Sequence, residues 1–192
     1  LYLLAADGSL RHDHEIETYW RVSRTTIHEP RLDDVLVRDF DGDGDWEAVL
    51  GTVDGFTQVI DHTFRQRWID GETNHGTTEM QAVDWNGDGI LDVAVGNRYG
   101  KLRIYQVTDG ALLANLGSEL GDVQLAVADL NGDGTLQMIN GSSTGALRCG
   151  RSSRDISWEF PNHGYTVRDI LCLDMRDDAR LETLIAADTE FV

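Results

Sequence analysis

Four short acidic segments recur along the chain, and their oxygen-bearing side chains are spaced as the ligands of a hard cation would be. They read DFDGDGDWE from Asp39, DWNGDGILD from Asp84, DLNGDGTLQ from Asp129 and DMRDDARLE from Asp174. Calcium takes about six to eight oxygen ligands from carboxylate, amide and backbone carbonyl groups. Glycines between the acidic positions allow the sharp turn that points these oxygens inward. The spacing therefore predicts calcium-binding loops.

The candidate ligands occupy the first, third, fifth, seventh and ninth positions of the first three loops, and the seventh residue contributes its backbone carbonyl. They are Asp39, Asp41, Asp43, Asp45 and Glu47; Asp84, Asn86, Asp88, Ile90 and Asp92; and Asp129, Asn131, Asp133, Thr135 and Gln137. In the third loop Gln137 replaces the final carboxylate. We therefore expect two calcium sites and a third, weaker one.

The fourth loop departs from this pattern. Arg176 stands at the third position and Ala179 stands where the other loops have glycine. A cation inside the loop repels calcium, so we expect Asp174, Asp178 and Glu182 to pair with Arg176 or Arg180 instead.

A simpler interpretation is that the loops are only polar turns, because Asp, Asn and Gly dominate turns for conformational reasons. Three copies with an acid or amide at positions one, three and five favour calcium. An EF-hand or dockerin would need a helix after a 12-residue loop. The segments that follow here, AVLG and VAVG, are typical of strands.

The loops belong to a longer repeat, because Asp39, Asp84, Asp129 and Asp174 are each separated by 45 residues. Two and four residues before each first Asp lie apolar residues, and this period of two marks a strand with one buried face. These residues are Val35, Val37, Met80, Ala82, Leu125, Val127, Ile170 and Cys172. After each loop, EAVLG, DVAVG, QMING and ETLIA are apolar on both faces, as in a central strand.

Each repeat thus predicts four short antiparallel strands, which is one blade of an all-β propeller. Residues 1–192 form one propeller region with about four blades, beginning with a partial blade over residues 1–30. Leu3, Ala5, Ala6 and Asp7 match Leu184, Ala186, Ala187 and Asp188, so the start looks like the tail of a preceding blade. This duplication favours part of a larger ring of seven or eight blades.

The loop pattern followed by a short apolar strand and Gly resembles the FG-GAP or VCBS repeats of integrin α-subunit propellers and bacterial surface proteins. The resemblance implies structural calcium ions in turns between strands, and ligands or partner domains on the loop face. A clear Phe-Gly/Gly-Ala-Pro signature is absent, which argues against an integrin-like ligand site more than against the architecture.

Charge and hydropathy exclude some classes of partner and indicate a location. The 34 Asp and Glu residues against 16 Lys and Arg give a net charge of −18, which disfavours nucleic acid as a partner. No apolar run is long enough to enter a bilayer directly. Loops of this type suit the high calcium concentrations outside cells, so we expect an extracellular, surface or periplasmic location.

We therefore expect a non-enzymatic adhesion or interaction module with a protein or glycan ligand, and possible contacts with further blades or domains of a longer chain. The alternative is a domain of a secreted enzyme, either a polysaccharide lyase or a quinoprotein-like oxidoreductase. The Asp109-Gly110 turn, Trp68 and Trp158 also fit quinoprotein-type blades. No convergent nucleophile, base or phosphate loop points to a catalytic residue.

Other reactive or aromatic residues have structural explanations. Cys149 and Cys172 occupy positions held elsewhere by Val and Ile, which indicates core packing, with a disulfide as the alternative. Trp20, Trp46 and Trp85 suit blade packing or, alternatively, a glycan-binding surface. The six histidines show no metal-binding spacing, so surface or turn positions are expected.

Overall fold

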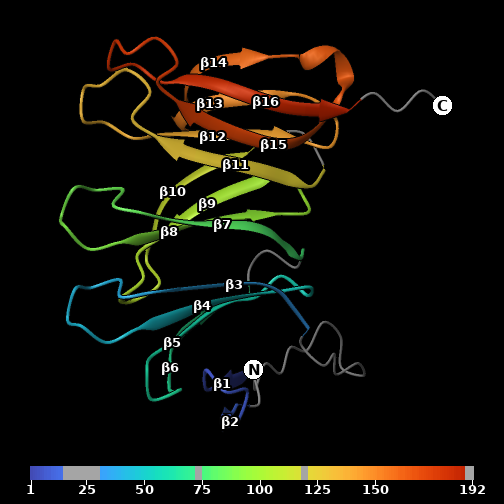
Figure 1. Cartoon of the computed structure of the whole chain (residues 1–192). Coiled ribbons are helices and arrows are strands. Elements are labelled where there is room, and N and C mark those ends of the chain that lie inside the picture. Colours follow the sequence, from blue (N-terminus) through green and yellow to red (C-terminus); the bar gives the residue numbers. More distant parts are fainter. Residues whose placement is uncertain (15–30, 72–74, 118–120, 189–192) are drawn as a thin grey trace.

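The computed structural model describes residues 1–14, 31–71, 75–117 and 121–188, and these form sixteen β-strands and one turn of 3-10 helix at Asn162–Gly164. The described strands make three four-stranded sheets and two two-stranded sheets, all antiparallel between neighbours (Figure 1). The predicted all-β fold with four-stranded blades is confirmed.

Each complete blade is a meander in which consecutive strands pair. The first blade contains β3 (Leu32–Arg38), β4 (Glu47–Thr52), β5 (Thr57–Ile60) and β6 (Gln66–Asp70). The second contains β7 (Thr77–Val83), β8 (Asp92–Asn97), β9 (Lys101–Tyr105) and β10 (Leu112–Gly117). The third contains β11 (Val123–Ala128), β12 (Gln137–Ser142), β13 (Leu147–Ser152) and β14 (Asp155–Phe160).

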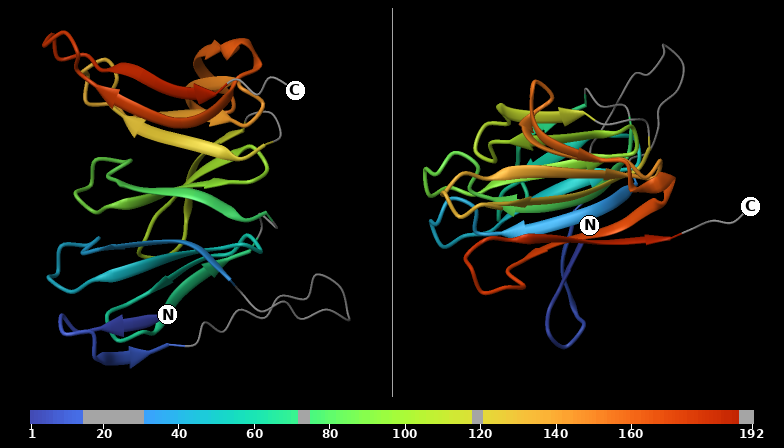
Figure 2. Two further views of the ribbon diagram at one scale, coloured as in Figure 1. Left: turned by 45° about the vertical axis from the view of Figure 1, so that its right-hand side comes forward. Right: turned by 90° about the horizontal axis from the view of Figure 1, so that it is seen from above.

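The sheets stack face to face from the N-terminal to the C-terminal end (Figures 1 and 2). The second strand of each blade is apolar on both faces because it lies at the centre of this stack, and β4 and β8 are buried along their whole length. Hydrophobic clusters fill the space between successive blades rather than the inside of any one blade. Burial of these apolar faces is the main stabilising contribution to the stack.

A glycine ends the central stretch of each second strand because the next blade approaches closely there. A Cβ added to Gly51 would lie 2.6 Å from the Thr77 side chain. The same addition at Gly96 would meet Val123 at 2.9 Å, and at Gly141 it would meet Val167 at 2.8 Å. The repeated Gly therefore sets the distance between blades.

The two remaining sheets are halves of blades. At the N-terminal end, β1 (Tyr2–Leu4) pairs with β2 (Leu10–Asp13), and at the C-terminal end, β15 (Thr166–Leu173) pairs with β16 (Glu182–Asp188). The β15–β16 pair flanks the fourth acidic loop, so it is the first and second strand of a blade. Together with the complete blades, the strands account for about four blades, as expected.

The structure corrects the alignment of Leu3 with Leu184. The pairs Tyr2–Asp13, Leu3–His12 and Leu4–Leu10 repeat the pairs Gln58–Ile69, Val59–Trp68 and Ile60–Gln66 at a constant offset of 56 residues. Both hairpins even shift register at the same place. The β1–β2 hairpin is therefore the third and fourth strand of a blade, and it does not duplicate β16. The duplication that favoured a larger ring is therefore absent, and the number of blades in the ring stays a prediction.

Both cysteines pack as small core residues, as expected. Cys149 is buried in the cluster between the third blade and β15, Cys172 packs against that cluster, and neither forms a disulfide. Burial raises the pKa of the Cys149 thiol to about 11, so this thiol is a poor nucleophile at neutral pH. In the described part of the chain, no helix has the length and apolar character to cross a bilayer.

Candidate metal sites in the acidic loops

All four acidic loops join the first and second strands of a blade, and they project from the same side of the stack (Figure 1). This common position follows from the 45-residue repeat, because each blade presents its first turn in the same direction. The fifteen predicted ligands therefore fall into three separate loops, one per complete blade, rather than into one composite centre.

The first Asp of each loop organises the backbone. In the first three loops its two oxygens accept hydrogen bonds from the amide nitrogens of the glycines at positions four and six, as Asp39 does from Gly42 at 2.7 Å and Gly44 at 3.0 Å. Asp84 and Asp129 make the same pairs of bonds. The glycines have positive φ, between 74° and 91°, which is why glycine is required there.

The ninth residue closes each loop from inside the blade. Glu47, Asp92, Gln137 and Glu182 each accept a hydrogen bond from the amide nitrogen of the loop's second residue, at 2.9–3.1 Å. Glu47 and Asp92 are fully buried. A buried carboxylate needs a compensating charge or several hydrogen bonds, and the loops differ in how they meet this need.

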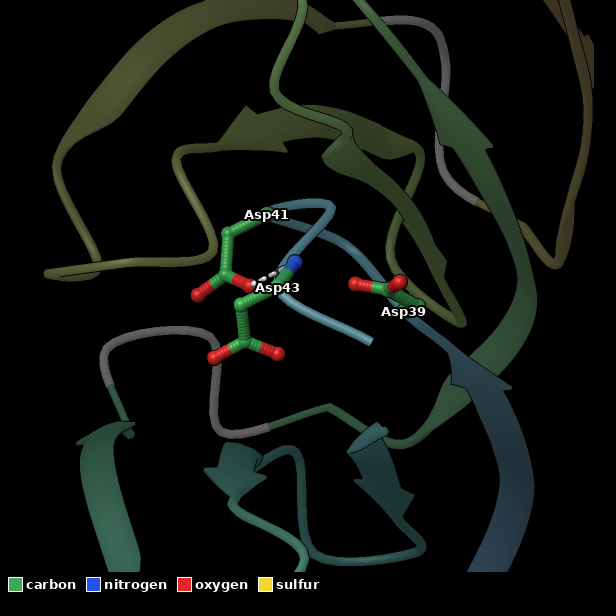
Figure 3. Close-up of side chains that lie close together, drawn as sticks. All are labelled: Asp39, Asp41 and Asp43. Atoms are coloured by element: carbon green, nitrogen blue, oxygen red, sulfur yellow. Dashed lines mark hydrogen bonds between the residues drawn. The ribbon is translucent and has the colours of Figure 1, made fainter. Parts of the chain in front are cut away.

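In the first loop, oxygens of Asp39, Asp41 and Asp43 lie within 4.8 Å of one another. Figure 3 shows the three carboxylates around the turn, with the amide of Asp43 bonded to Asp41. The guanidinium of Arg67 from β6 bonds Asp41 at 3.2 Å and Glu47 at 2.8 Å. Arg67 thus pairs with two of the five predicted ligands, and its single positive charge balances one of their two negative charges. Burial nevertheless raises the pKa of Glu47.

In the second loop, no such cation is present among the described residues. One oxygen of Asp92 accepts the bond from Trp85, while Oδ1 is buried with no hydrogen-bond partner. Burial, together with the nearby charges of Asp88 and Asp84, raises the pKa of Asp92 to about 6. An orphaned carboxylate oxygen with the charges of Asp84 and Asp88 nearby suits a divalent cation. The donor set of the second loop therefore fits calcium.

In the third loop, Gln137 removes one negative charge from the predicted site. Its amide oxygen accepts the bond from Leu130 at 3.0 Å. Hydrogen bonds from Asn131 and Thr135 lower the pKa of Asp133. Nearby, Arg151 bonds the backbone oxygen of Leu136 and stacks over the Trp85 ring at 4.7 Å. The weaker third site stays a prediction.

The fourth loop keeps the backbone frame but lacks the ligand set. Of the three acids expected to pair with an arginine, Glu182 pairs with Arg176 at 3.2 Å. In the described residues Asp174 and Asp178 instead accept hydrogen bonds from backbone amides, and no ion pair of Arg180 is found. Asp177 and Ala179 have φ of 55° and 62°, at positions where the other loops have glycine. The backbone frame therefore forms here with an arginine, whose side chain is largely exposed, in place of the third predicted ligand.

Sequence reasoning missed Arg67, because it lies outside the loop motif and has no equivalent arginine one repeat later. Trp85 is buried at the second loop, so it does not form part of a glycan-binding surface. Trp46 is partly buried and packs edge-on to Phe64 at 5.3 Å. Trp20 lies outside the described residues. The tryptophans at these loops therefore serve blade packing.

Stacked antiparallel blades with first turns on one side define the class of the protein, a β-propeller. A family model described as FG-GAP-like repeat matches residues 84–139, which include the second and third acidic loops. The resemblance noted from the loop pattern is thereby confirmed. No curated protein matches the sequence.

Solved structures similar to the chain share the fold at low sequence identity. A structure of BBS1N in complex with ARL6DN is 13% identical, with TM-score 0.60 over 84% of this chain and 49% of that chain. The exotype rhamnogalacturonan lyase YesX is 17% identical, with TM-score 0.55 over 96% of this chain and 40% of that one. The computationally designed Ika8 protein gives 15% identity, TM-score 0.59, and 83% and 47% coverage. The chain thus spans about half of these proteins or less.

Proposed function

We propose that the chain is a calcium-stabilised propeller module that works outside the cytoplasm as an interaction or adhesion unit. The observation that carries the calcium proposal is the buried, unpartnered Oδ1 of Asp92 in the second loop. Asp84, Asn86, Asp88, the carbonyl of Ile90 and Asp92 would hold the ion there. The first loop would use its own five residues once Arg67 moves aside, and the third would bind more weakly.

Bound calcium would supply positive charge and rigidity, while the chain supplies a frame that already exists. Because an ion that binds only the folded state stabilises it by mass action, a concentration of 100 times Kd contributes about 2.7 kcal/mol. The role of calcium is therefore structural.

The test is thermal unfolding and calorimetric titration of chelator-treated protein with calcium chloride. Asp88→Ala should lower the number of sites and the calcium-dependent rise in the unfolding temperature. Asp178→Ala is the matched control, because Asp178 holds the same frame position in the fourth loop and bonds the Arg180 amide as Asp88 bonds the Ile90 amide. A transition unaffected by chelation would mean that the loops are polar turns only.

The interaction role rests on the common side of the four loops and on the match to an FG-GAP-like repeat. A protein or glycan partner would dock on this loop side, and calcium would hold the loops in place. Binding to surface proteins and oligosaccharides, measured with calcium and with chelator, tests this role. Equal binding with calcium and with chelator would show that the partner site does not depend on calcium in the loops.

A second candidate is a domain of a polysaccharide lyase, because the rhamnogalacturonan lyases YesX and YesW are among the similar structures. The likeness is one of fold, at 14–17% identity. Release of unsaturated products from rhamnogalacturonan by the purified chain would support this candidate. The expected result is no turnover.

A further inference from the structure

We propose that the first and second acidic loops bind calcium cooperatively through one shared peptide group, whereas the third loop binds independently of the second. This inference rests on the proposed calcium function and adds how the sites act on one another. The shared group is the peptide bond between Ile90 and Leu91. Its amide nitrogen, on Leu91, donates a hydrogen bond to the backbone carbonyl of Phe40 in the first loop at 2.8 Å.

The two ends of this peptide group face different loops. All peptide bonds of the described residues are trans, so the carbonyl of Ile90 points opposite to the N–H of Leu91. The N–H is directed at Phe40 in the first loop. The carbonyl, a predicted ligand of the second loop, is therefore directed away from the first. The next residue, Asp92, carries the buried oxygen without a partner, so the ion expected in the second loop lies at this segment.

The acceptor of the bond belongs to the frame of the first loop. Phe40 is the second residue of that loop, and its amide nitrogen donates to Oε2 of Glu47, the ninth residue, at 3.1 Å. Its carbonyl belongs to the peptide group that continues to Asp41, another predicted ligand. The bond from Leu91 therefore fixes a residue that is connected to two predicted ligands of the first loop.

Burial strengthens the connection. Phe40 and Glu47 are at most 1% exposed, and Leu91 packs against the hydrophobic cluster between the first and second blades. Hydrogen bonds in such surroundings polarise one another. A cation on the Ile90 carbonyl draws electron density from the peptide nitrogen, so the N–H becomes a stronger donor to Phe40. By linkage, an ion in the first loop raises the affinity of the second by the same factor.

The junction between the second and third loops lacks this bond. The equivalent amide belongs to Leu136 and the equivalent carbonyl to Trp85, each 45 residues further along the chain. Within the described part of the chain, no hydrogen bond joins these two groups. The guanidinium of Arg151 instead stacks over the Trp85 ring at 4.7 Å and donates to the Leu136 carbonyl at 3.1 Å. The third loop therefore has no direct peptide connection to the second.

The junction between the third and fourth loops contains the bond again. The amide of Leu181 donates to the carbonyl of Leu130 at 3.0 Å, although the fourth loop lacks the calcium ligand set. The connection is therefore part of the repeat, and its loss at Leu136 is a local change. We expect coupling between neighbouring calcium loops only where both the bond and two ligand sets are present, which is at the first and second loops.

The first test is calorimetric titration of the full chain with calcium chloride after individual loops are disabled. Asp43→Ala, Asp88→Ala and Asp133→Ala remove the fifth-position carboxylate of the first, second and third loops, and chains with two working loops are compared with chains that keep one. For the first and second loops together, the product of the two binding constants should exceed the product of the separate constants by about fivefold or more. For the second and third loops together, the two products should agree.

A pair of proline variants tests the peptide group itself. Leu91→Pro removes the N–H that reaches Phe40 and keeps the Ile90 carbonyl. In the Asp133→Ala chain it should reduce the product of the binding constants to that of independent sites. Leu136→Pro is the matched control, because Leu136 holds the same repeat position and makes no bond to Trp85. This control should leave the coupling between the first and second loops unchanged.

Amide hydrogen exchange tests the connection without altering it. In a chain with Asp43→Ala and Asp133→Ala, only the second loop is expected to bind calcium. Calcium should then slow the exchange of the Leu91 amide and also of the Phe40 amide in the first loop, because local opening of a connected segment becomes rarer. The Leu136 amide should exchange at the same rate with calcium and with chelator.

The outcomes separate this inference from the proposed function. Calcium binding to the first and second loops with independent constants would overturn the coupling and leave the calcium sites standing. Coupling that survives Leu91→Pro, or a Phe40 amide that does not respond to calcium in the second loop, would also overturn it. Absence of calcium binding at every loop would overturn both the proposed function and this inference.

Discussion

The carboxylate of Asp92 accepts a hydrogen bond from the amide of Trp85 at 3.1 Å through one oxygen, while its other oxygen is buried without a partner. This pair places a negative charge beneath the second acidic loop with nothing in the described residues to neutralise it. The relationship makes the second loop the site at which removal of calcium should have the largest effect.

The first prediction concerns Asp92→Asn in chelator. The pKa of Asp92 is raised from 3.8 to about 6 in the folded state, so its charged form costs stability above about pH 6, and that cost disappears as pH falls toward 4. A pKa shift of this size corresponds to about 3 kcal/mol of unfolding free energy. Asp92→Asn should therefore raise the unfolding free energy at pH 8 and change it little at pH 4.

At pH 8 calcium should make the wild type more stable than Asp92→Asn. The wild-type carboxylate would bind the ion, and the amide of the variant is a poorer ligand. Urea unfolding at both pH values, with calcium and with chelator, provides the measurement. A variant that is less stable than wild type in chelator at pH 8 would contradict the prediction.

The second prediction concerns Arg67, whose guanidinium pairs with the fully buried Glu47 at 2.8 Å. Arg67→Ala leaves that carboxylate unpaired, and loss of one partner of a buried pair typically costs about 3–5 kcal/mol. In chelator the variant should lose stability of this order. Calcium should restore part of it and bind the first loop more tightly. Arg65→Ala, an exposed neighbour, is the control and should change neither quantity.

The third prediction concerns the contact between the first strands of the second and third blades, β7 and β11. Glu79 accepts a hydrogen bond from the amide of Leu125 at 2.9 Å. Burial raises its pKa, and the charges of Asp169 and Asp34 add to this effect. A raised carboxyl pKa costs stability above that pKa and none below the unfolded value. Glu79→Gln keeps an acceptor for Leu125, as Gln81 does for Val127.

Glu79→Gln should therefore be more stable than wild type at neutral pH, and the difference should shrink to zero in acid. Thermal unfolding between pH 7 and pH 4 in chelator measures this. A difference that grows as pH falls would contradict the stated sign.

The fourth prediction concerns the spacing between blades. A Cβ at residue 96 lies 2.9 Å from a methyl group of Val123, so Gly96→Ala forces the second and third blades apart and should cost about 1–3 kcal/mol. Gly117→Ala is the control, because among the residues that the structure describes its added Cβ would meet only Ser153, at 3.5 Å. Equal unfolding temperatures for the two variants would show that the stack adjusts freely.

The fifth prediction restores the fourth loop. Asp177→Gly and Ala179→Gly relieve positive φ at two non-glycine residues and should each stabilise the chain by about 1 kcal/mol. Adding Arg176→Asn removes the guanidinium that pairs with Glu182. The triple variant should bind one more calcium ion by calorimetric titration. The double variant, which keeps Arg176, should not.

Much of the fold was predictable because the features that define the repeat are interactions between residues close together in the sequence. Positive-φ glycines, Asp side chains that bond nearby amides, and strands of period two act within a few residues, so the loop at Asp84 and the strand at Asp92 follow from their own segments. The burial of Trp85 and the orphaned oxygen of Asp92 were not predictable, because both depend on packing between blades.

The sequence by itself determined the 45-residue repeat, the four strands of each blade and the positions of the acidic loops. Only the tertiary structure decided that Arg67 occupies the first loop and that β1–β2 are third and fourth strands, which corrected the alignment of Leu3 with Leu184. The physical reason is that a local pattern specifies which conformation a segment adopts. Pairing register and neutralisation of buried charge depend on residues brought close by the stacking of whole blades.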